Sequence, residues 1–126
     1  MGDNKLTSFT KLDAWKKSHE LVLEVMKVCE TMPRYDALRS QLERAALCIT
    51  RNIAEGFGRQ TINDKKYFYV IARGSAYEVQ NQLLIGVDSH KITREVFQEL
   101  AYKSVSSIKL IHGLIRSLEK ARNATS

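Results

Sequence analysis

Cationic side chains concentrate in the middle of this 126-residue chain, where their types and spacing suit binding to phosphate. Residues 37–61 carry four arginines and two glutamates. Arg44 and Arg51 are seven residues apart, which is about two helical turns, so their side chains leave one side of a helix. Guanidinium groups bind phosphate through two hydrogen bonds and stack on nucleobases. The sequence therefore predicts phosphate contacts at six cations: Arg44, Arg51, Arg59, Lys65, Lys66 and Arg73.

Aromatic residues follow two of these cations directly. Tyr67, Phe68 and Tyr69 come after the lysine pair, and interleaved basic and aromatic groups are typical of proteins that bind single-stranded nucleic acid. The alternative has nearly equal weight: the arginines form ion pairs, and the aromatic rings belong to the core or to an interface. The carboxylates available for such pairs are Glu43, Glu55, Asp64 and Glu78.

Asn52 and Glu55 also have two interpretations. They either orient Arg59 or Arg44 to receive a phosphate, or they bond to the loop backbone and to a neighbouring arginine. The second interpretation is favoured, because the end of a helix needs such partners in any case.

No group of residues in the sequence indicates catalysis or a bound metal. His19, His90 and His112 fall in three different segments, and neither Cys29 nor Cys48 has a partner at the spacing of metal ligands. Glu-x-x-His motifs, which di-iron bundles require, are absent. No base accompanies any serine, and there is no phosphate-binding glycine loop. We expect a protein that is not an enzyme and that holds no metal and no cofactor.

The overall charge permits nucleic-acid binding without requiring it. The formal net charge is +6, and residues 1–36 balance at six charges of each sign. Many ordinary proteins share such an excess. The C-terminal cations are predicted to form a solvated helix face, favourably placed near a helix C-terminus. They are Lys109, Arg116, Lys120 and Arg122.

The chain has no run of eighteen apolar residues and no apolar leader, so we expect no membrane segment and a cytoplasmic location. The two cysteines are expected to be small buried residues rather than a disulfide. The five tyrosines exceed the needs of one small core. We expect some of them on the surface, where tyrosine suits an interface.

Apolar residues repeat at helical spacing in four segments. The expected helices run from Leu12 to Thr31, from Asp36 as N-cap to Glu55, from Thr61 or Asn63 to Ser89, and from Thr93 to Arg122. Short connections place successive helices antiparallel. The prediction is an all-α, up-down-up-down four-helix bundle in one domain, residues 1–126, with loosely ordered tails at 1–10 and 123–126.

Two glycines carry specific expectations. Gly56 is predicted to end the second helix in the left-handed conformation. Gly74 lies in the middle of a helix, where glycine costs about 1 kcal/mol relative to alanine. We expect a close approach of helices, opposite Ala45 or Ala46, to offset that cost.

One uninterrupted pattern carries a family resemblance. It reads Gln41-x-x-Arg44-Ala45-Ala46-x-x-Ile49-x-x-Asn52-Ile53-Ala54-Glu55-Gly56-x-Gly58-Arg59. This pattern resembles the signature of small four-helix-bundle proteins encoded in bacterial 23S ribosomal RNA intervening sequences. That family is similar in fold to the accessory variability proteins of diversity-generating retroelements. Further matches are Phe9-x-x-Leu12-x-x-Trp15 and Ile71-Ala72-Arg73-Gly74-Ser75-x-x-Glu78-x-x-x-Gln82-Leu83, and one departure is Cys48, where the family usually has serine.

The resemblance implies a homo-oligomer, a pentamer in particular. It implies a basic surface that engages structured RNA or DNA, either beside a reverse transcriptase or in connection with a 23S rRNA intervening sequence. The alternative hypothesis is a structural or protein-interaction module with no nucleic-acid partner.

Overall fold

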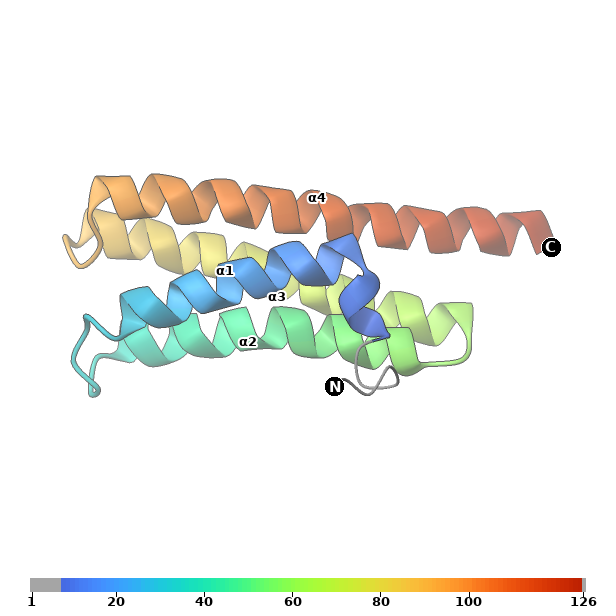
Figure 1. The fold of residues 1–126 in the computed structure, drawn as a ribbon, viewed down its shortest axis with the longest axis horizontal. Coiled ribbons are helices and arrows are strands. Elements are labelled where there is room, and N and C mark those ends of the chain that lie inside the picture. The colour runs from blue at the N-terminus through green and yellow to red at the C-terminus, as the bar shows by residue number, and fades with distance from the viewer. Residues whose placement is uncertain (1–7, 126) are drawn as a thin grey trace.

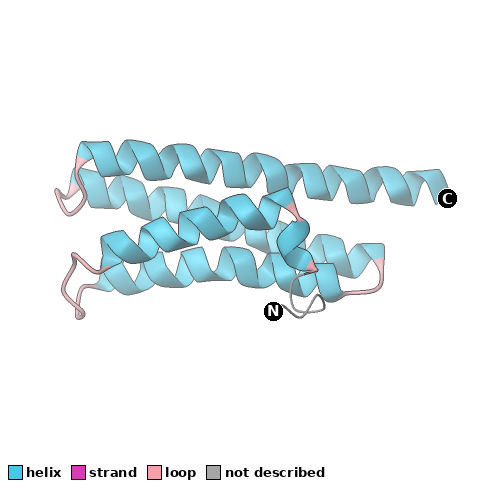
Figure 2. Ribbon diagram, in the orientation of Figure 1, coloured by secondary structure: helices cyan, strands magenta, loops and turns pink. Residues whose placement is uncertain are grey.

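The structure, a computed structural model, describes residues 8–125. A 3-10 helix, Phe9–Lys11, precedes four α-helices. These are α1 (Asp13–Cys29), α2 (Ala37–Gly58), α3 (Ile62–Asp88) and α4 (Arg94–Thr125). No strand occurs in the described range (Figure 2). The predicted tails therefore overlap helical residues at both ends, while residues 1–7 and 126 lie outside the described range.

The helices form an antiparallel four-helix bundle, as predicted. Each helix packs against the next one in sequence, and α1 also packs against α4, which closes the ring of contacts. Figure 1 shows that the chain reverses direction at each connection and that α4 extends beyond the other helices at its C-terminal end. α1 and α3 lie diagonally across the bundle and do not contact each other.

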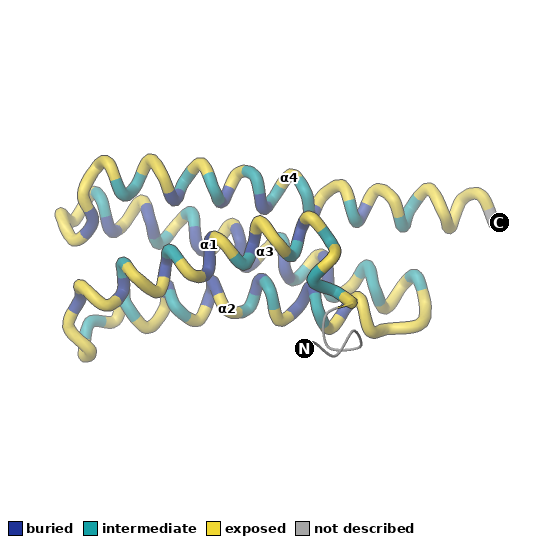
Figure 3. The backbone as a smooth tube through the Cα atoms, viewed as in Figure 1, coloured by how far each residue is buried: buried dark blue, intermediate teal, exposed yellow. Residues whose placement is uncertain are grey.

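One face of every helix is buried along the bundle axis (Figure 3). The fully buried large side chains come from all four helices: Leu21, Val25, Leu42, Ile49, Ile53, Val79, Leu83, Leu100 and Ile111. Burying one such side chain stabilises a fold by about 1.5–3 kcal/mol. The apolar stripes that predict the helices are thus the stripes that hold them together.

The N-termini of α2 and α3 are capped by the residue types expected there. Asp36 accepts a hydrogen bond from the backbone N–H of Leu38 at 2.9 Å, and Thr61 accepts one from Asp64 at 3.1 Å. Asp36 also pairs with Lys91 at 2.7 Å, which ties the first connection to the third. The Lys91 ammonium and then the Leu38 N–H hold the pKa of Asp36 below its usual value.

The prediction for Gly56 is wrong. α2 continues to Gly58, and no described glycine has a positive φ. Gly56 is buried instead against Tyr69, where an added Cβ would lie 2.7 Å from Cε1 of the ring. The absence of a side chain therefore serves the approach of α3 to α2, not the end of α2.

The prediction for Gly74 is wrong as well. This glycine is exposed, and an added Cβ would meet no atom within 4 Å. A close contact at a helix glycine occurs instead at Gly86, where a Cβ would collide with the side chain of Ile92 in the connection between α3 and α4. Among the described residues of one copy, no close contact requires a glycine at position 74.

Candidate nucleic-acid interface

Two of the six predicted cations, Arg44 and Arg51, lie on the exposed surface of α2, which we call the α2 flank. Arg44 donates to the Gln41 side chain at 2.9 Å, and Arg51 donates to Sγ of Cys48 at 3.3 Å. Both arginines are exposed, and neither forms an ion pair with a described carboxylate. Their charge is therefore not neutralised within the described chain.

Arg59 is held by its own helix end. It pairs with Glu55 at 2.7 Å and lies over the ring of Phe68 at 4.7 Å from the centroid. The amide of Asn52 instead donates to the Cys48 carbonyl at 2.7 Å. Of the two candidate orienting residues, Glu55 holds Arg59 and Asn52 does not. An ion pair is thus present at this arginine, as both interpretations allow.

The two lysines also have partners within the bundle. Lys65 donates to the Phe57 carbonyl at 2.7 Å and so caps the end of α2. Lys66 pairs with Glu119 of α4 at 2.8 Å. The hydrogen bond from Lys66 is the main reason that the pKa of Glu119 lies below its usual value. These cations join helices, which makes them weaker candidates for phosphate contacts than the three arginines at 44, 51 and 73.

Arg73 belongs to a ladder of polar contacts between α3 and α4. Residues 66, 73 and 80 are seven apart on α3 and face α4 in turn. Lys66 meets Glu119, and Gln80 meets Ser104 at 3.0 Å. Between them, Arg73 meets His112, with 3.0 Å between Nη1 and Nδ1. The arginine in the middle of the ladder thus faces an imidazole where the lysine one step away faces a carboxylate.

The chemistry of the two side chains fixes the direction of that hydrogen bond. A guanidinium carries donors and no acceptor, so Nδ1 of His112 must accept. The tautomer that fits this contact carries its ring proton on Nε2. The Nε2–H stays available as a donor to a further group.

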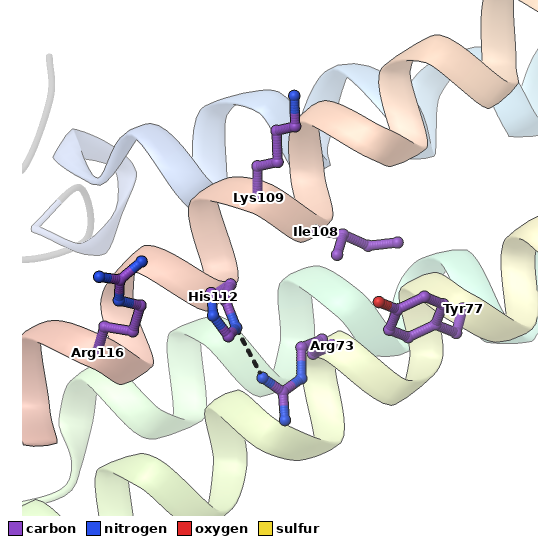
Figure 4. A pocket seen from close by; sticks show the side chains of 6 residues that line it. All are labelled: Arg73, Tyr77, Ile108, Lys109, His112 and Arg116. Atoms are coloured by element: carbon purple, nitrogen blue, oxygen red, sulfur yellow. Dashed lines mark hydrogen bonds between the residues drawn. The ribbon is translucent and has the colours of Figure 1, made fainter.

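Arg73 and His112 line an open groove of about 650 Å³ between α3 and α4. The complete lining is Arg73, Tyr77, Ile108, Lys109, His112 and Arg116, which includes three cations and no carboxylate. Figure 4 shows Arg73 and His112 pointing toward each other, while Lys109 and Arg116 extend from α4 away from Arg73.

Of the six residues that line this groove, only Arg73 is among the predicted site residues. Lys109 and Arg116 were expected on a solvated face, and His112 was considered only as a metal ligand. Lys109, His112 and Arg116 recur at i, i+3 and i+7, so they form one stripe on α4. That spacing is visible in the sequence, but the alignment of the stripe with Arg73 depends on the register between two antiparallel helices.

The tyrosines divide as expected between core and surface. Tyr69 is 4% exposed, and burial raises its pKa. The other four are exposed: Tyr35, Tyr67, Tyr77 and Tyr102. Cys29 and Cys48 are both free, and only Cys29 is fully buried.

The described residues contain neither a cluster of metal ligands nor a membrane-spanning helix. No group of three His, Cys, Asp or Glu side chains in this part of the chain is arranged to hold a metal ion. Between residues 8 and 125, no helix combines the length and the apolar character needed to cross a bilayer.

Comparison with known proteins agrees with the bundle. The family described as 23S rRNA-intervening sequence protein matches residues 10–113. A crystal structure from Bacteroides thetaiotaomicron, of a protein with unknown function from the S23 ribosomal protein family, matches with a TM-score of 0.77 and 23% identity. The match covers 81% of this chain and 97% of that one, and at this identity it shows the fold alone. No curated protein matches this chain.

Proposed function

This chain belongs to the 23S rRNA-intervening sequence protein family, and on that premise we propose that it is a non-enzymatic protein that assembles with copies of itself and binds structured RNA or DNA. The protein would act in one of two settings. It would either assist a reverse transcriptase or bind the RNA of a 23S intervening sequence. The pentamer that the resemblance implies is the proposed assembly.

The nucleic-acid proposal rests on three arginines whose charge is not paired with a carboxylate. Arg44 and Arg51 lie on the α2 flank, and Arg73 lies in the α3–α4 groove. None of the three forms an ion pair with a described carboxylate. Cations of this kind release counterions when they bind phosphate, which favours binding at low salt.

An exposed stripe on α3 supports the assembly. Residues 67, 70, 74, 77, 81 and 84 follow the alternating three- and four-residue spacing of a coiled-coil seam. We name this set the α3 seam: Tyr67, Val70, Gly74, Tyr77, Asn81 and Leu84. Its four large apolar members are 38–63% exposed. Gly74 would let a second helix approach closely, and the polar Asn81 would help to set the register.

We expect the substitution Gly74→Gln to break the assembly. Glutamine raises helix propensity, so the bundle should remain folded, but its side chain would occupy the space that a second copy needs. Gly113→Gln is the matched control, because Gly113 is also exposed in a helix with no atom within 4 Å of an added Cβ. Light scattering after size exclusion should show an oligomer for the wild type and the control, and a smaller particle for Gly74→Gln. A monomeric wild type would contradict the proposed assembly, and an intact oligomer in Gly74→Gln would contradict the role of the seam.

We expect binding to a labelled RNA hairpin to fall steeply with salt. For about six phosphate contacts the loss is roughly 10³-fold between 50 and 200 mM salt. The double variant Arg44→Gln, Arg51→Gln should lower the salt slope by about two. The control is Lys17→Gln with Lys27→Gln on α1, which removes the same charge from a helix that does not contact α3.

A flat salt response would refute the nucleic-acid proposal. An equal decrease of the salt slope in the two double variants would mean that the net charge of the protein, and not the α2 flank, governs binding. A wild type that purifies without nucleic acid and binds none at low salt would favour the interaction module. The structural roles of Arg59, Lys65 and Lys66 already agree with that alternative.

A further inference from the structure

We infer that the α3–α4 groove is a phosphate site, in which Arg73, oriented by His112, binds one backbone phosphate of a nucleic-acid strand and Lys109 and Arg116 add charge around it. The inference rests on the proposed function. It goes further by assigning one site, one oriented guanidinium and three residues of α4.

The ladder between α3 and α4 provides the first argument. At Lys66 the facing residue of α4 is Glu119, and the two charges neutralise each other at 2.8 Å. One step along, the facing residue is His112, which orients Arg73 through a hydrogen bond but leaves its charge in place. The contact between α3 and α4 thus forms an ion pair at Lys66. Seven residues later it orients the Arg73 guanidinium without neutralising its charge. A phosphate oxygen would take the place of the missing carboxylate.

The donors around the groove provide the second argument. Only one guanidinium nitrogen of Arg73 takes part in the contact with His112, so the remaining N–H groups can bind an anion. Lys109 and Arg116 stand about one turn to either side of His112 on the same stripe of α4, where they would reinforce the positive potential.

The shape of the groove provides the third argument. It is open to solvent, and its volume of about 650 Å³ exceeds what one phosphate needs. An open channel suits a strand that passes through better than a small molecule that must be enclosed. Tyr77 and Ile108 form an apolar end against which the sugar attached to the phosphate can pack. Tyr77 stands at the boundary between this groove and the α3 seam.

The test is the substitution His112→Glu, which would complete the ladder. The new carboxylate should pair with Arg73 as Glu119 pairs with Lys66, so the bundle should fold with unchanged helicity by circular dichroism. Gln98→Glu is the matched control, because it makes the same change of charge at an exposed position of α4 outside the groove. A second variant, Arg73→Gln, removes the central donor without adding a negative charge.

Two probes are used: a short single-stranded RNA followed by fluorescence anisotropy, and inorganic phosphate followed by NMR shifts of the His112 imidazole. We expect His112→Glu and Arg73→Gln to weaken RNA binding at least tenfold. Arg73→Gln, which keeps the reporter imidazole, should also abolish the phosphate-induced shifts of His112. Gln98→Glu should retain the shifts and lose no more than about threefold in RNA affinity.

Equal RNA affinities for His112→Glu and Gln98→Glu would overturn the groove assignment while leaving the proposed function in place. A wild type that binds inorganic phosphate at His112 but no RNA would support the phosphate site and refute the proposed function. A change in the mass of the assembly in His112→Glu, with RNA affinity unchanged, would identify the groove as a protein contact and overturn the inference.

Discussion

Replacing Ile49 with alanine should lower the free energy of unfolding by about 2–5 kcal/mol. Ile49 is 0% exposed in the buried face of α2, which packs against both α1 and α3. Truncation removes three carbons from the core, and the neighbouring helices cannot close the cavity completely, because they are held along their whole length. The loss therefore includes a cavity contribution in addition to the lost burial.

Leu47→Ala is the control for Ile49→Ala. Leu47 belongs to the same helix but is 49% exposed, so the expected loss is within about 0.5 kcal/mol. Both variants are measured by urea unfolding at one fixed protein concentration, since self-assembly would make stability depend on concentration. Similar losses for the two variants would show that Ile49 does not lie in the core described here.

Replacing Gly56 with alanine should destabilise the bundle, although alanine is the better helix former. An added Cβ would lie 2.7 Å from Cε1 and 2.9 Å from Cδ1 of Tyr69, and 3.2 Å from the Lys65 carbonyl oxygen. The tyrosine ring is buried and the carbonyl belongs to α3 itself, so neither can move aside easily. Overpacking of this kind costs about 1–3 kcal/mol.

Gly58→Ala separates packing from helix propensity. Gly58 lies in the same last turn of α2, and an added Cβ would meet no atom within 4 Å. That substitution should be neutral or stabilising by up to about 1 kcal/mol. The two variants are therefore expected to shift the urea midpoint in opposite directions. Parallel shifts would contradict the close contact between Gly56 and Tyr69.

Much of the fold follows from local features of the sequence. The four helices begin and end within a few residues of their expected positions, because apolar periodicity and capping side chains act over short distances. Asp36 and Thr61 cap their helices as predicted. Pro33 separates α1 from α2, although α1 ends at Cys29 rather than Thr31. Short connections then leave antiparallel packing as the simplest arrangement.

The glycines mark where local rules fail. Gly56 looks like a helix terminator in the sequence, since glycine after a helical stripe often adopts the left-handed conformation. Its actual role depends on Tyr69, thirteen residues later on another helix. Gly74 shows the opposite case. The sequence predicts a close helix–helix contact there, and among the described residues of one copy there is none. The sequence shows where a glycine lacks a side chain. Only the packing of the helices shows which neighbouring group occupies the space beside it.

The candidate site divides in the same way. The sequence by itself determined that arginines cluster in the middle of the chain, that Arg44 and Arg51 share one side of a helix, and that no metal or catalytic pattern is present. Only the tertiary structure decided which cations are neutralised. Arg59 and Lys66 pair with Glu55 and Glu119, whereas Arg73 faces His112.

The physical reason is the range of the interactions involved. Helical periodicity and capping depend on residues within about four positions of one another, so they can be read along the chain. The partners of Arg73 depend on the register of α3 against α4, which the packing of the whole buried core sets. A shift of one helical turn between these helices would separate His112 from Arg73, and the groove would no longer have this lining. The sequence would be the same in both arrangements.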